Sequence, residues 1–211
     1  MNFEINWNTE SRLLFFICIL LSLFVGLLGD MTMHRYLKET EKVHMTAMTG
    51  MVITAVFTGI YGFSFTTLRC VLLCYFLILA GTADIAVREI PDVFHLLIAL
   101  AGLIGFRPIP ALIGLLLVPL PFLIAALITG KIGGGDVKLM AASGFALGVL
   151  GGFRMMFWGL LTALLWSLLV ERDKKDISLE KRSIPLAPFL AFGCFVVLLP
   201  VAGSGSNLIG G

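Results

Sequence analysis

Long apolar runs alternate with short polar connections along nearly the whole chain. Eight runs can be separated: 13–29, 45–63, 68–86, 93–106, 109–129, 137–152, 155–170 and 184–201. A helix rises about 1.5 Å per residue, so about 20 apolar residues cross the hydrocarbon core of a bilayer. The pattern therefore predicts an all-α polytopic transmembrane bundle of about eight helices. Run 93–106 is short enough to be re-entrant or interfacial.

Local features refine the ends of these helices. Pro119 and Pro121 are expected to kink run 109–129. Asp30 follows the first run and is expected to end its helix. The leading segment MNFEINWNTESR is net acidic, whereas a cleavable signal peptide starts with a basic region, so we interpret 13–29 as a span.

Composition supports a membrane protein and excludes several other classes. Of the 211 residues, 59% are hydrophobic and 13% charged, against about 25% charged in an average globular protein. This excludes a disordered chain, a coiled coil and an ordinary soluble enzyme, and makes the lipid bilayer a partner. The net charge of +2 gives no reason to expect nucleic acid. We expect one membrane domain over 1–211, with an N-terminal helix pair at 13–63 and a core at 68–201.

Basic residues divide unequally between the two sides that the eight runs define. Eleven of the 15 lysines and arginines fall on one side and four on the other, the four being Arg12, Arg69, Arg107 and Arg154. Cytoplasmic loops carry the excess of Lys and Arg. We therefore expect an inner-membrane protein whose crowded side faces the cytoplasm and whose termini both lie outside. The charged segment 171–183 would then be a cytoplasmic loop.

Two aspartates fall at the ends of runs that approach this crowded side. Asp84 ends run 68–86 and Asp136 precedes run 137–152, so the topology puts both at one depth. Ionisable residues near membrane depth are functional candidates. Paired carboxyl groups at the edge of an apolar bundle suit aspartic proteolysis, in which one activates water and the other polarises the scissile carbonyl.

The flanks of the two aspartates suggest different roles. Asp136 would stand at a helix N-terminus, where the helix dipole favours an anion, and Asp84 near a helix C-terminus, where it does not. The hypothesis from the sequence is that Asp136 is ionised and Asp84 protonated.

The neighbouring residues are candidates for substrate binding and support. Gly133, Gly134 and Gly135 could adopt positive φ and let an extended substrate approach. Lys138 could stabilise the ionised aspartate, contact the substrate or reach the membrane interface. Pro91 and Asp92 begin run 93–106, and Asp92 is expected to cap it.

Other residues suggest packing rather than chemistry. Gly144, Gly148 and Gly152 recur every four residues and predict close packing against another helix. The four cysteines form no CxxC pair, and His34, His44 and His95 lack metal-ligand spacing. We therefore expect neither a metal nor a cofactor.

Three segments resemble type IV prepilin peptidases, membrane aspartic proteases related to archaeal preflagellin peptidases. GGGDVKLMAASGFALG, which contains Asp136, resembles the GxGD segment of that family. DIAVREIPD, which begins at Asp84, is similar to the segment of the family's first aspartate. IPLAPFLAFG, with Pro185 and Pro188, is similar to its last segment. The motifs stand in the family's order over roughly 70–200.

The resemblance implies an aspartic endopeptidase that removes a short basic leader from pilin-like precursors at the cytoplasmic face, with Asp84 and Asp136 catalytic. Bifunctional relatives carry a cytoplasmic domain with CxxC pairs, whereas the segment 30–44 is short and has no cysteine. Methylation of the product therefore has no support from the sequence. Two alternatives stay open: a proton-coupled transporter that uses the same acids, and an inert scaffold of a pilus or secretion machine. Oligomeric state is not predicted.

Overall fold

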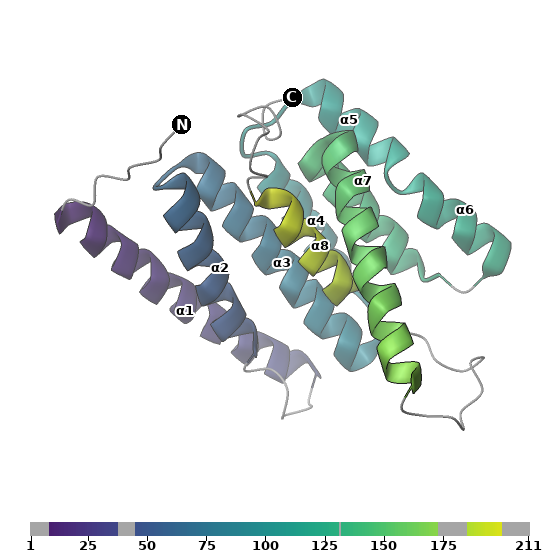
Figure 1. Ribbon diagram of the computed structural model, residues 1–211, viewed down its shortest axis with the longest axis horizontal. Helices are drawn as coiled ribbons and strands as arrows, with labels where there is room; N and C mark the ends of the chain where they lie inside the picture. The colour runs from purple at the N-terminus through teal and green to yellow at the C-terminus, as the bar shows by residue number, and fades with distance from the viewer. Residues whose placement is uncertain (1–8, 38–44, 131, 173–184, 200–211) are drawn as a thin grey trace.

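The computed structural model describes residues 9–37, 45–130, 132–172 and 185–199, and the regular structure in these residues is helical. Figure 1 shows the helices in chain order: α1 (Thr9–Leu37), α2 (Met45–Tyr61), α3 (Phe65–Val87), α4 (Asp92–Gly102), α5 (Pro108–Leu117), α6 (Leu120–Thr129), α7 (Gly134–Arg172) and α8 (Ala187–Leu198). Because α5 and α6 divide one apolar stretch, the eight helices form seven apolar helical stretches in the described residues. The all-α prediction is confirmed, and the number is close to the expected eight.

Not every helix is long enough to cross a bilayer. Four stretches are long and apolar enough by length and composition: Leu13–Met31, Phe65–Val87, Pro108–Thr129 and Gly134–Leu169, the last of which turns back at Gly148. The helices α2, α4 and α8 are shorter. The 11 residues of α4 rise only about 16 Å, roughly half of the hydrocarbon core. Run 93–106 is thus too short for a full span, in agreement with its interpretation as a re-entrant or interfacial segment.

Pro119 separates α5 from α6, as predicted. α5 ends at Leu117 and α6 begins at Leu120, because proline lacks the N–H that a continuous helix needs. The expectation for Asp30 was wrong, since α1 continues to Leu37. The backbone N–H of Ala47 instead donates to the Asp30 carboxylate at 3.3 Å. Asp30 therefore satisfies a free donor at the start of α2.

α7 folds back on itself at Gly148, whose backbone has φ 73° and ψ −177°. A Cβ on Gly152 would lie only 3.3 Å from the Cα of Gly144. Eight residues of straight helix would separate the two glycines by about 12 Å. The arms 134–147 and 149–172 therefore lie side by side and run in opposite directions (Figure 1). They correspond to the predicted runs 137–152 and 155–170, but the turn comes before Arg154 rather than beside it.

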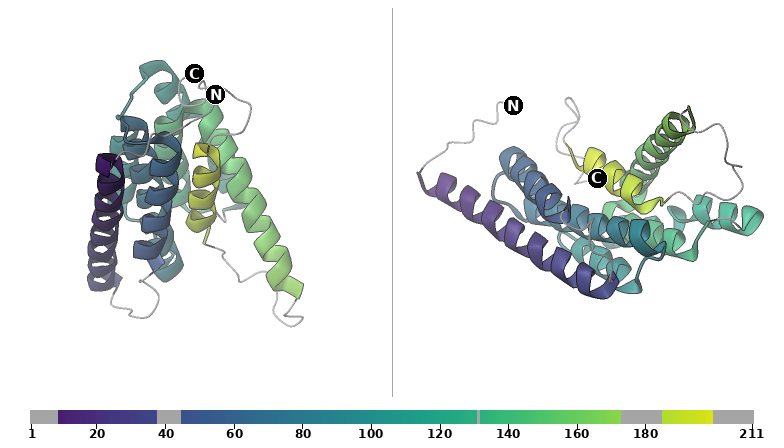
Figure 2. Two further views of the ribbon diagram at one scale, coloured as in Figure 1. Left: turned by 60° about the vertical axis from the view of Figure 1, so that its left-hand side comes forward. Right: turned by 90° about the horizontal axis from the view of Figure 1, so that it is seen from below.

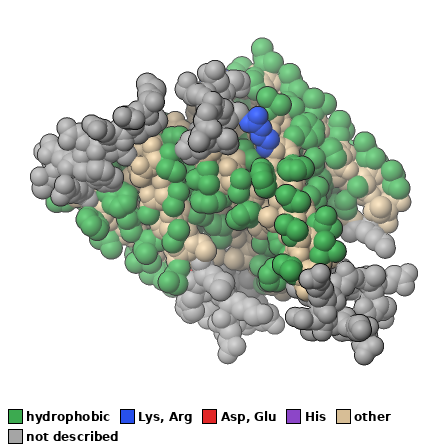
Figure 3. Space-filling model, in the orientation of Figure 1, with side chains coloured by type: hydrophobic (Ala, Val, Ile, Leu, Met, Phe, Trp, Pro, Cys, Tyr) green, Lys and Arg blue, Asp and Glu red, His purple; other side chains and the backbone are tan. Residues whose placement is uncertain are grey.

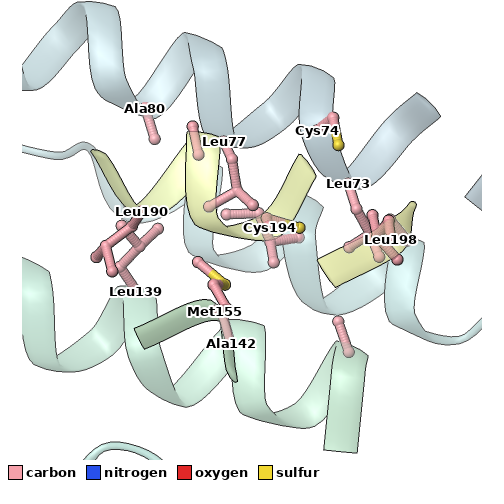
Figure 4. Close-up of a cluster of buried hydrophobic side chains, with 14 of the residues drawn as sticks. Leu73, Cys74, Leu77, Ala80, Leu139, Ala142, Met155, Leu190, Cys194 and Leu198 are labelled. Atoms are coloured by element: carbon pink, nitrogen blue, oxygen red, sulfur yellow. The ribbon is translucent and has the colours of Figure 1, made fainter. Parts of the chain in front are cut away.

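The short helix α8 lies between α3 and the two arms of α7. Figure 4 shows Leu190 and Cys194 of α8 facing Leu77 of α3 on one side and Met155 of α7 on the other. These side chains are almost fully buried. Glycines bring the backbones close, because a Cβ on Gly81 would lie 3.0 Å from the Cα of Pro188. The position of α8 is thus fixed from both sides.

The predicted glycine contacts involve α5. A Cβ on Gly144 would overlap the carbonyl oxygen of Gly114, and a Cβ on Gly152 would lie 2.7 Å from Val118. The prediction of close packing is confirmed for these two positions. Gly148 differs, because it forms the turn.

α1 and α2 stand at one edge of the bundle, against α3 (Figure 2). The hydroxyl of Tyr75 on α3 donates to the carbonyl of Val25 on α1 at 2.8 Å. The described part of the face in Figure 3 is almost entirely apolar. α1 itself leaves large side chains such as Phe16 and Leu20 more than 60% exposed. Such a surface is suited to lipid.

Candidate active site

Asp84 and Asp136 line one pocket of about 300 Å³ at one end of the bundle. Asp84 lies in the last turn of α3 and Asp136 in the first turn of α7. The two carboxyl groups are close enough for their negative charges to repel. The other residues that line the pocket are Arg88, Glu89, Ile90, Asp92, Gly133, Gly134, Gly135 and Lys138. The structure thus brings together the two aspartates that the sequence separates by 52 positions.

Arg88 ends α3 and turns the chain into the pocket wall. Its backbone is left-handed, with φ 56°, and its N–H donates to the carbonyl of Asp84 at 3.0 Å. A left-handed residue is a common way to end a helix. Glu89 and Ile90 follow and continue the wall. Pro91 does not line the pocket, and instead precedes α4 as its N-cap residue.

The carboxylate of Asp84 also lies at the start of α8. The backbone N–H of Ala187 donates to its Oδ2 at 3.0 Å, and the backbone of Leu186 contributes a further hydrogen bond. Asp84 is only 8% exposed. Both aspartates therefore lie at helix N-termini, α8 for Asp84 and α7 for Asp136. The dipole argument that made Asp136 the ionised member no longer separates them.

The three glycines before Asp136 differ in their positions. Gly133 precedes α7, whereas Gly134 and Gly135 form its first turn. None of them has positive φ, so the predicted conformational reason for glycine was wrong. A Cβ on Gly134 would meet nothing within 4 Å, whereas one on Gly135 would contact Ile90. The packing of the described residues thus does not require glycine at 134, which faces open space in the pocket wall.

Asp92 and Lys138 join the starts of α4 and α7. The ammonium of Lys138 donates to Asp92 Oδ1 at 2.7 Å. This bond holds the pKa of the Asp92 carboxyl below its usual value of 3.8. Asp92 makes no capping hydrogen bond, so the capping prediction was wrong. The side chain of Lys138 pairs with Asp92, which is not one of the partners expected from the sequence.

His95 lies near the site, although it belongs to none of the motifs and has no metal-ligand spacing in the sequence. Its Nε2 lies 3.1 Å from the carbonyl oxygen of Gly135, the residue before Asp136. Its Nδ1 lies 3.4 Å from Asp92 Oδ1. A helical argument could have found part of this, since His95 lies three residues after Asp92 and so shares its face of α4.

Basic residues lie at both ends of the bundle. Arg88 and Lys138 line the aspartate pocket. Arg69 and Arg107 line a small cavity at the other end of the bundle, beside Gly148, where α7 turns back on itself. The guanidinium of Arg69 donates there to the carbonyl of Ala146, which the turn frees from the helix. Most of the expected loop 171–183 lies outside the described residues.

A comparison with known families identifies the core of the chain. The profile of the type IV leader peptidase family matches residues 71–169. This segment belongs to the type IV leader peptidase family. The match begins in α3, includes both Asp84 and Asp136, and ends in the second arm of α7. No curated protein and no solved structure matches the chain.

The match of residues 71–169 to the leader peptidase family supports a peptidase, and the long apolar helices support a membrane protein. The match ends before α8. The contact between Ala187 and Asp84 connects this unmatched helix to the site.

Proposed function

We propose that the protein is a membrane-embedded aspartic endopeptidase that removes the short basic leader from pilin-like precursors. The observation that carries the proposal is the pocket shared by Asp84 and Asp136, at one end of an otherwise apolar bundle. Both residues lie within the segment that belongs to the leader peptidase family. A solvent-accessible pair of carboxyl groups is the minimum that acid–base peptide hydrolysis needs.

In the proposed reaction the two carboxyl groups share one proton. The ionised member removes a proton from a water molecule as the water oxygen attacks the scissile carbonyl carbon. The protonated member donates a hydrogen bond to the carbonyl oxygen, which gains negative charge. The tetrahedral intermediate then collapses: its C–N bond breaks and the leaving nitrogen takes a proton from the dyad. This chemistry uses no cofactor.

Asp84 is proposed as the ionised member, contrary to the hypothesis from the sequence. Its carboxylate accepts backbone N–H donors from the start of α8. Hydrogen bonds donated to a carboxylate stabilise its charged form. The shared proton then resides on Asp136, whose neighbour Asp84 carries the negative charge.

The lining of the pocket suits a basic, extended substrate. Four of its side chains are acidic and two are basic, and one of the two, Lys138, is already paired with Asp92. The remaining negative charge would attract the cationic leader. The open space beside Gly134 leaves room for an extended peptide backbone. The excess of Lys and Arg supports a cytoplasmic orientation for this end.

Co-expression in bacterial membranes tests the proposed function. The protein is expressed with tagged pilin-like precursors, and the products are read by gel shift and by the mass of the new N-terminus. We expect one cut at the boundary between the basic leader and the apolar helix. Absence of cleavage for every precursor, together with proton flux in liposomes, would refute the proposal and favour a proton-coupled transporter.

A further inference from the structure

His95 connects α4 to the residue before Asp136. A carbonyl oxygen only accepts hydrogen bonds, so the 3.1 Å contact with Gly135 requires a proton on Nε2 of His95. The side chain is 10% exposed, and burial lowers the pKa of His95 below its usual value. Both ring nitrogens face acceptors, and the contact of Nε2 with Gly135 at 3.1 Å is shorter than that of Nδ1 with Asp92 at 3.4 Å. We therefore place the single proton of a neutral imidazole on Nε2.

A second contact joins the same two helices on the other side of Asp136. Lys138 follows Asp136 by two residues and donates to Asp92. Asp92 and His95 are three residues apart and lie on one face of α4. The first turn of α7 is therefore held to α4 at Gly135 and at Lys138, with Asp136 between the two contacts.

We propose that His95 is a positioning residue, which holds the Asp136 carboxyl group opposite Asp84 by donating from Nε2 to the carbonyl of Gly135. The inference rests on the proposed function, because it assigns His95 a part in placing the dyad. His95 itself touches neither the substrate nor the reacting atoms.

The proposed role does not depend on the charge of His95. The charged groups that face the ring are Asp92 on its own helix and Lys138 on α7. Nδ1 makes no hydrogen bond with the described residues. Protonation of Nδ1 would add a donor toward Asp92 Oδ1, but the Nε2 donor is present in both states. Activity is thus expected to need the donor and not the titration of the imidazole.

Two variants of similar size separate positioning from packing. His95→Gln keeps an N–H donor that can reach the Gly135 carbonyl, whereas His95→Met fills similar space without one. Leu96→Met is the control, because Leu96 is the next residue of α4 and is 61% exposed. Each purified full-length variant is assayed for kcat, KM and pH profile on the precursor that the wild type cleaves. Hydrogen exchange of the peptide covering 132–140 is measured in parallel.

For His95→Met we expect kcat to fall by about tenfold or more, since small misplacement of a catalytic group is costly. KM should change little, and exchange at 134–138 should become faster. His95→Gln should retain most of kcat, with slow exchange and an unchanged pH profile.

Equal kcat and equal exchange in the Gln and Met variants would overturn the proposal, because packing alone would then explain His95. A changed pH profile in His95→Gln would also overturn it, since His95 would then act by proton transfer. If the wild type cleaves no precursor, the proposed function fails, while hydrogen exchange still decides whether His95 holds the turn.

Discussion

Gly193→Ala should destabilise the protein and disturb the site from a distance. Gly193 lies on α8, where an added Cβ would overlap the carbonyl oxygen of Met155 and lie 2.8 Å from the nitrogen of Gly159. Ordinary contact begins near 3.4 Å, so α8 would have to move by about 0.6 Å from α7 to clear the Gly159 nitrogen, and further to clear the Met155 oxygen. On the opposite side of α8, a Cβ added to Gly81 of α3 would lie only 3.0 Å from the Cα of Pro188. The helix therefore has little room on either side.

The expected cost of Gly193→Ala is about 2–3 kcal/mol, near the upper part of the range for overpacked sites. For a protein of this size that lowers the melting temperature by about 4–12 °C. A shift of α8 away from α7 is a shift toward α3, which would distort the 3.0 Å bond from Ala187 to Asp84 on α3. Cleavage by the folded fraction should therefore fall as well.

Thermal unfolding in detergent, followed by the fluorescence of a thiol-reactive dye, measures the first effect. The buried cysteines of the core make such a dye a reporter of unfolding. Gly59→Ala is the matched control, because a Cβ at this exposed position of α2 meets nothing within 4 Å. An unchanged melting temperature for Gly193→Ala, equal to that of Gly59→Ala, would refute the packing argument.

Two further predictions concern the turn of α7 and the pair at the pocket edge. Gly148→Ala should cost about 1–3 kcal/mol, because φ 73° with ψ −177° is strained for any residue with a Cβ; a melting temperature equal to that of Gly59→Ala would contradict this. Lys138→Met should raise the pKa of Asp92 toward 3.8, since the ammonium favours its charged form. In the wild type the contribution of the Lys138–Asp92 pair to the free energy of unfolding is complete above pH 3.8. It is lost as the pH falls through the lower pKa that Asp92 has in the folded protein. A ¹³C NMR titration of Asp92 in both proteins measures this, and identical titration curves would show that Lys138 does not act on Asp92.

The sequence was sufficient for the all-α class and for the order of the helices along the chain, because apolar runs, prolines and glycines act locally. Pro119 interrupts its helix wherever it lies, and Gly144 permits close backbone contact whatever its neighbour is. The topology of the runs also brought Asp84 and Asp136 to one end. The turn at Gly148 was harder to locate, because several glycines and Arg154 offered neighbouring positions for it.

Long-range hydrogen bonds could not be predicted from the sequence. The donor to Asp84 comes from Ala187, 103 residues away, and α8 is too short and apolar to suggest such a contact. The role of Asp30 was missed for the same reason, since its acceptor function depends on where α2 begins. Composition reports which residues prefer lipid or the core, but not which distant backbone groups lack a partner.

The central claim is most directly tested by the cleavage rates of four purified proteins: wild type, Asp84→Asn, Asp136→Asn and Asp30→Asn. Asp30→Asn is the matched control, because Asp30 is also buried but lies outside the pocket, and asparagine still accepts the Ala47 N–H. We predict that both pocket variants lose cleavage while their melting temperatures stay close to that of the wild type, and that Asp30→Asn cleaves. Appreciable cleavage by either Asp84→Asn or Asp136→Asn would contradict a catalytic dyad.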